Sequence, residues 1–101
     1  MDNDKFINLC KRFVVDYVNQ SDYETCYGYR PYIKKWHVFV VWLCKTLQNN
    51  KALLSTTVDG DPRYYEITYN GDEDCFYFDV YDKLINKRIN RSGLFAKEDW
   101  L

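Results

Sequence analysis

The stretch HVFVVWLCKTLQNNKALLSTTV, residues 37–58, joins two apolar runs through the polar triplet Gln48-Asn49-Asn50. The first run, Val38 to Leu43, is unbroken and rich in β-branched and aromatic residues, which favours a strand with both faces covered. The second run extends from Ala52 to Val58. Because asparagine tolerates left-handed backbone angles, the triplet suits a turn, and the stretch predicts a β-hairpin at the centre of a small sheet.

A helix over residues 32–47 is the competing interpretation. Apolar side chains in this range also recur at helical spacing, at Trp36, Phe39, Val40, Leu43 and Leu47. Residues branched at Cβ restrict χ1 against the preceding helical turn, and three valines lie within 38–41. We therefore favour the strand, although so short an apolar run leaves both interpretations open.

Two more strands are predicted after the turn sequence Asp59-Gly60-Asp61-Pro62, and Asn70-Gly71 opens the hairpin between them. Alternation of side chains assigns their faces. The core-facing set is Tyr65, Ile67, Tyr69, Phe76, Phe78 and Val80, and the opposite set is Tyr64, Glu66, Thr68, Tyr77, Asp79 and Tyr81. Short turns between successive strands predict an antiparallel meander with strands near 38–46, 51–58, 63–69 and 75–82.

Residues 4–19 have the periodicity of an amphipathic helix, and Asp2, Asn3 or Asp4 can cap its amino end. The apolar stripe of this helix needs the sheet to bury it. The fold class is therefore α+β, with one N-terminal helix packed on a four-stranded antiparallel β-meander in a single domain, residues 1–101. The expected core contains Val40, Trp42, Leu54, Ile67, Phe78 and Val80, together with Phe13 and Tyr17.

Residues 21–36 are irregular and rich in rings. The rings are Tyr23, Tyr27, Tyr29, Tyr32 and Trp36, with Arg30, Lys34 and Lys35 between them. A loop held down by its own rings and a recognition surface both fit this composition, because Tyr, Trp and Arg dominate binding hot spots. Near the carboxyl end we expect a turn at 84–87 and a short strand at 88–89. Phe95 and Trp100-Leu101 are expected to pack on the body or on a partner.

Signatures of enzymes and metal sites are absent from the sequence. His37 is the only histidine, and no P-loop or HExxH motif occurs. The four cysteines, at 10, 26, 44 and 75, have no CxxC spacing, so a zinc site is not expected. We expect all four thiols to be reduced, with Cys10 and Cys44 buried. The prediction is a protein that is not an enzyme, with no cofactor and no metal.

The amino end, Asp2-Asn3-Asp4, does not resemble the basic start of a signal peptide, and no apolar run reaches the about 18 residues of a membrane span. We therefore expect a cytoplasmic protein that does not contact membranes.

Charge is distributed unevenly along the chain, although the net charge is only −1. Residues 59–82 hold eight acids and one base, a balance of −7, and the remaining residues carry +6. Such asymmetry indicates a polar partner, while solubility of the sheet edges is the simpler explanation. The predicted binding surface combines acids that steer a partner with rings that anchor it. Its residues are Asp59, Asp61, Glu66, Asp72, Glu73, Asp74 and Asp79, with Tyr77 and Tyr81.

The strings KTLQNNKALLST (45–56), YYEITYNGD (64–72) and DVYDK (79–83) resemble motifs of a family of short uncharacterised proteins from bacteriophages and prophages of Gram-positive bacteria. The resemblance leaves out residues 21–36 and the tail after Ile89. It implies a small, phage-encoded accessory protein, and it transfers no activity and no site residue.

Three functions are compatible with the sequence. The first is a non-enzymatic inhibitor of a bacterial defence protein, of the anti-CRISPR type. Its acidic surface would dock on the basic nucleic-acid-binding groove of a host protein such as a Cas nuclease, with no direct nucleic acid binding by the inhibitor. The second is a small-molecule binder, such as a sponge for a nucleotide signal, with the Tyr-rich loop stacking the base. The third, an enzyme dependent on His37, has the least support. The oligomeric state and the choice between the acidic region and residues 23–36 as the binding surface stay open.

Overall fold

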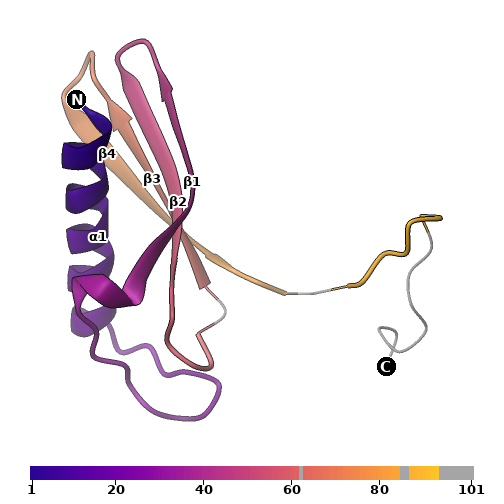
Figure 1. Cartoon of the computed structure of the whole chain (residues 1–101). Helices are drawn as coiled ribbons and strands as arrows, with labels where there is room; N and C mark the ends of the chain where they lie inside the picture. Colours follow the sequence, from indigo (N-terminus) through magenta and orange to yellow (C-terminus); the bar gives the residue numbers. More distant parts are fainter. Residues whose placement is uncertain (62, 85–86, 94–101) are drawn as a thin grey trace.

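The computed structural model describes residues 1–61, 63–84 and 87–93. The elements are a helix, α1 (Asn3–Gln20), a short 3-10 helix, η1 (Lys35–His37), and four strands, β1 (Val38–Thr46), β2 (Asn49–Thr56), β3 (Arg63–Asn70) and β4 (Cys75–Asp82). The strands form one antiparallel sheet in the order β1-β2-β3-β4. Figure 1 shows α1 lying along one face of this sheet, while no helix of the described chain covers the other. The fold is α+β, as predicted, and the strand at 38–46 excludes a helix there.

Helix α1 begins where Asp2 caps it, because the Asp2 carboxylate accepts a hydrogen bond from the Lys5 N–H at 2.8 Å. Its buried stripe is Phe6, Cys10, Val14 and Val18. Below this stripe lie core residues of three strands, Val38, Ala52, Leu54, Tyr65, Ile67 and Tyr69, together with Ile33. This helix contains no stretch long and apolar enough to cross a membrane, and the same is true of every helix in the described residues.

The β1–β2 hairpin differs from the prediction in position and in turn. It lies at one side of the sheet, so β1 is an edge strand with one exposed face, and β2 and β3 are central. The link is Leu47-Gln48, and Leu47 adopts the left-handed backbone angle (φ 56°). Asn49 and Asn50 belong to β2, because their backbones pair with Thr46 and Lys45.

Strand β1 contains a β-bulge between Val40 and Trp42. Because of this bulge, the predicted burial of Trp42 and of Cys44 is wrong. The extra residue shifts the alternation by one, so Leu43 packs against the core in place of Trp42. Trp42 is 41% exposed on the uncovered face of the sheet. Cys44 is exposed for the same reason, whereas Cys10 is fully buried as predicted. All four cysteines are free thiols.

The remaining core predictions divide into two groups. Leu54 and Ile67 are fully buried. Val40, Phe13, Phe78 and Val80 are partly buried against the core, and Tyr17 is 38% exposed although its ring contacts Tyr65 and Phe78.

The loop before β1 is fixed to the sheet by Arg63. Its guanidinium carbon lies 3.3 Å from the centre of the Tyr23 ring and about equally far, 5.5 and 5.4 Å, from the rings of Tyr17 and Tyr65. The Asp61 carboxylate pairs with the Arg63 Nε at 3.1 Å. One buried cation therefore joins helix, loop and sheet through cation–π contacts and an ion pair.

Beyond β4, Leu84 is 93% exposed and Ile89 forms an isolated β-bridge. The predicted turn at 84–87 includes residues outside the described chain, and the anchors Phe95 and Trp100-Leu101 lie outside it as well.

Candidate functional site

The uncovered face of β3 and β4 brings acids and rings together. Register pairs Tyr64 with Tyr81, Glu66 with Asp79, and Thr68 with Tyr77. Paired residues of neighbouring strands point to the same face of a sheet, so these side chains form one continuous surface. We call the set Tyr64, Glu66, Tyr77, Asp79 and Tyr81 the open-face cluster.

Two carboxylates stand directly opposite each other in this cluster. Glu66 and Asp79 are cross-strand partners, and like charges in that position destabilise a sheet. The Lys51 Nζ lies 3.4 Å from the Glu66 Oε1 and offsets the charge of that carboxylate. No cation in the described chain lies within ion-pair distance of the exposed Asp79. The cluster therefore keeps a net negative charge, at some cost to folding.

Exposed rings flank the two acids. Tyr77 is 52% exposed and Tyr81 is 49% exposed. The pKa of Tyr77 is raised, chiefly by the adjacent Cys75 side chain and further by the Glu73 carboxylate. The Tyr77 hydroxyl thus stays protonated at neutral pH and can donate a hydrogen bond to a partner.

The turn between β3 and β4 supplies a second group of acids, at one end of the cluster. Asp72, Glu73 and Asp74 are exposed there. The Asn70 side chain accepts hydrogen bonds from the N–H groups of Asp72 and Glu73, which fixes the turn. The Tyr69 hydroxyl donates to the Asp74 carboxylate at 2.7 Å, and this bond raises the pKa of Tyr69.

Two of the predicted site residues lie at the other end of the strands. Asp59 is exposed in the turn before β3. The Asp61 side chain has no exposed surface and accepts hydrogen bonds from Thr56, Arg63 and Tyr65. The prediction that Asp61 is exposed is therefore wrong. The Asp61 carboxylate is buried because its negative charge compensates the buried Arg63 guanidinium. The structure groups Glu66, Tyr77, Asp79 and Tyr81 with the acidic turn, and separates Asp59 and Asp61 from them.

The sequence did not indicate that β1 adds to the uncovered face. Phe39 and Trp42 are 44% and 41% exposed. Trp42 pairs with Leu53 of β2, and Leu53 pairs in turn with Glu66 of β3. The unbroken apolar run suggested burial on both sides. Both rings are exposed because no helix of the described residues covers this face of the sheet, and the bulge turns Trp42 onto it.

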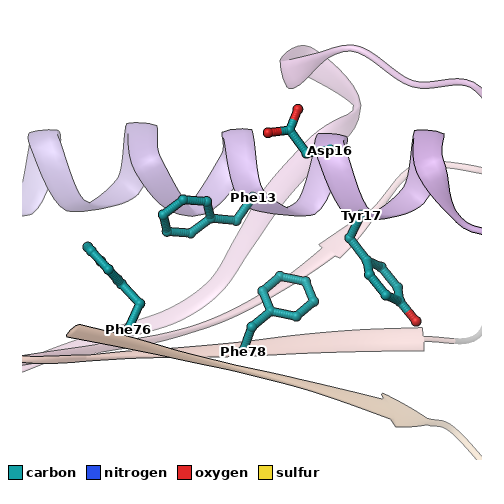
Figure 2. A pocket seen from close by; sticks show the side chains of 5 residues that line it. All are labelled: Phe13, Asp16, Tyr17, Phe76 and Phe78. Atoms are coloured by element: carbon teal, nitrogen blue, oxygen red, sulfur yellow. The ribbon is translucent and has the colours of Figure 1, made fainter.

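A separate apolar groove lies on the helix side of the sheet, between α1 and β4. Figure 2 shows Phe13 and Tyr17 of α1 beside Phe76 and Phe78 of β4, whereas the carboxylate of Asp16 is directed away from the strands. Its volume is about 270 Å³. The ring centres of Phe13 and Phe76 are 5.1 Å apart, and those of Tyr17 and Phe78 are 5.3 Å apart. The four rings give this groove no cation for a phosphate group.

The model of a family of unknown function (DUF6275) matches residues 7–91. No curated protein and no solved structure matches the chain.

Proposed function

The chain belongs to the family of unknown function DUF6275, since the match covers most of its length, and from its geometry we propose that it is a non-enzymatic inhibitor of a bacterial defence protein. The open-face cluster is the docking surface in this proposal. It meets a basic, nucleic-acid-binding groove of the target, in the manner of an anti-CRISPR protein acting in the cytoplasm of a phage-infected host. The sequence motifs shared with phage proteins support the phage origin in this proposal.

The observation that carries the proposal is the cross-strand pair of Glu66 and Asp79 between exposed tyrosines. A residue pair that opposes folding is expected at functional sites, where local rules are broken. Complementary charge steers association, and buried tyrosines supply most of the affinity at a protein interface. The acidic turn at 72–74 extends the negative surface of the open-face cluster, so that it could follow the basic groove of the target.

The Asp79→Lys variant gives a test in which stability and binding change in opposite directions. Lysine opposite Glu66 replaces a repulsion by an attraction, so the free energy of unfolding should rise by about 0.2–1 kcal/mol. Binding to the target should weaken at least tenfold, and the association rate should lose much of its salt dependence. Urea unfolding and surface plasmon resonance measure the two effects.

The target is found by passing a panel of Cas effectors and other defence nucleases over the immobilised protein, with nucleic acid as the competitor. Glu24→Lys, an exposed reversal in the loop before β1, is the matched control and should bind like the wild type. An Asp79→Lys protein that keeps its affinity and salt dependence would overturn the proposal, as would a panel in which nothing is retained.

The groove in Figure 2 does not favour a nucleotide sponge. Its lining is mostly aromatic and contains no basic side chain, so it offers no cation to a phosphate group. We therefore assign no nucleotide to this groove.

A further inference from the structure

The segment before β1 is held rigidly although it has little regular structure. The Asn19 side chain accepts a hydrogen bond from the Ile33 N–H at 2.8 Å and donates one to the Ile33 carbonyl at 3.0 Å. Pro31 and Ile33 are buried, and the alternating residues Tyr32 and Lys34 are exposed. The two side chains are therefore displayed by a fixed backbone.

Trp36 stands on a support of its own. Its ring stacks on the His37 ring, with centroids 3.7 Å apart and planes inclined by 26°. The His37 Nδ1 accepts a hydrogen bond from the Lys34 N–H at 2.9 Å, which sets the orientation of the imidazole. Trp36 is nevertheless 76% exposed, so one face of the indole is supported and the other is open to a ligand.

Two lysines beside these rings supply positive charge. Lys34 and Lys35 are exposed, and neither has an ion pair in the described part of the chain. The Lys34 Nζ lies 5.7 Å from the centre of the Tyr32 ring, which is 73% exposed. Arg30, by contrast, is occupied by Asp22 at 3.5 Å and by the Ser21 carbonyl. The available charge is thus concentrated at the two rings.

We propose that Tyr32, Lys34, Lys35 and Trp36 form a binding site for single-stranded nucleic acid. Exposed rings stack on unpaired bases without regard to sequence, and neighbouring cations contact the phosphates. A protein partner fits this site less well, because lysine is depleted at protein interfaces, whereas two exposed lysines flank the two rings here. The rings project from a loop with about three quarters of their surface in water. The site does not rest on the function proposed for the open-face cluster, and it departs from the sequence-based expectation that the chain does not bind nucleic acid directly.

The test is the fluorescence anisotropy of a labelled oligo-dT strand titrated with the full-length protein at low salt. Saturable binding is expected. Trp36→Ala should weaken it at least about fivefold, the lower limit for one stacked base. Replacing both Lys34 and Lys35 by Ala should reduce the slope of log K against log salt by about 1.4, since each phosphate contact on a single strand contributes about 0.7.

Trp42→Ala is the matched control, because it removes an exposed tryptophan from the sheet and should leave strand affinity unchanged. Thermal unfolding checks that each variant is folded. An abasic strand of the same length separates stacking from charge, and it should bind more weakly than oligo-dT.

Equal affinity for the abasic strand, or no effect of Trp36→Ala, would overturn the proposal. The absence of saturable binding between the wild-type protein and oligo-dT would also overturn it. This conclusion would hold even if Trp36→Ala abolished binding to a protein target.

Discussion

At the scale of single residues, the buried Asp61–Arg63 pair connects the helix, the loop before β1 and the sheet. The two side chains are 0% and 4% exposed, and the guanidinium is surrounded by Tyr17, Tyr23 and Tyr65. The Arg63 Nη2 is buried and has no hydrogen-bond partner among the residues that the structure describes. Asp61 is the one carboxylate that pairs with this cation in the described chain. Its loss would leave a buried charge uncompensated, which is far more costly than the loss of an exposed pair.

We predict that Asp61→Asn lowers the free energy of unfolding by about 3 kcal/mol, for this reason. Asp59→Asn is the control, since it changes an exposed acid of the same turn and should have an effect within about 0.5 kcal/mol. Urea unfolding followed by tryptophan fluorescence gives both values. Equal stability of the two variants would show that aromatic contacts alone hold Arg63.

At the scale of secondary-structure elements, the two hairpin turns support each other. The Gly71 N–H donates a hydrogen bond to the Asn49 side chain at 3.2 Å, and a Cβ at Gly71 would clash with the backbone carbonyl of Gln48. The β3–β4 turn therefore packs directly on the β1–β2 turn. The acidic residues 72–74 are positioned by this contact.

Gly71→Ala should reduce stability by about 2 kcal/mol, because a backbone atom cannot move aside as a flexible side chain does. Asp72→Ala, one residue away and exposed, should change stability by no more than about 0.5 kcal/mol. The denaturant midpoints of the two variants give this comparison, provided that the unfolding free energy of both depends equally steeply on denaturant concentration. A neutral Gly71→Ala would mean that the turns separate without cost.

At the scale of the whole molecule, one helix covers one face of a four-stranded sheet. The helix buries Cys10 completely, whereas the other three thiols are exposed or partly exposed. Burial raises the pKa of Cys10 from 9.0 to about 12, so almost no thiolate is present at neutral pH. The reactivity of Cys10 therefore reports opening of the entire core.

A thiol reagent should modify three cysteines of the native protein rapidly and the fourth only at the rate of unfolding. In denaturant all four should react at once, because none is in a disulfide. Cys10→Ala should lack the slow phase and keep the fast one. Rapid reaction of all four native thiols would contradict the packing of α1 on the sheet.

Local patterns in the sequence predicted α1, the four strands and the faces of β3 and β4, but they left a helix open for residues 32–47 and did not indicate η1. Period-two alternation in residues 63–70 and 75–82 places Ile67 and Phe78 inward and Glu66 and Asp79 outward, because the pleat itself imposes that geometry. The bounds of β1 and β4 were predicted from local chemistry in the same way, and Asp2, which caps α1, was one of three candidates.

Tertiary structure decided the rest, through contacts between residues distant in sequence. The bulge in β1 depends on its register with β2, and it turns Trp42 and Cys44 outward. Asp61 is buried because Arg63 is enclosed by rings from the helix and the loop, and no local pattern reveals such a partner. The pairing of Glu66 with Asp79, which defines the open-face cluster, exists only once β3 and β4 adopt their register.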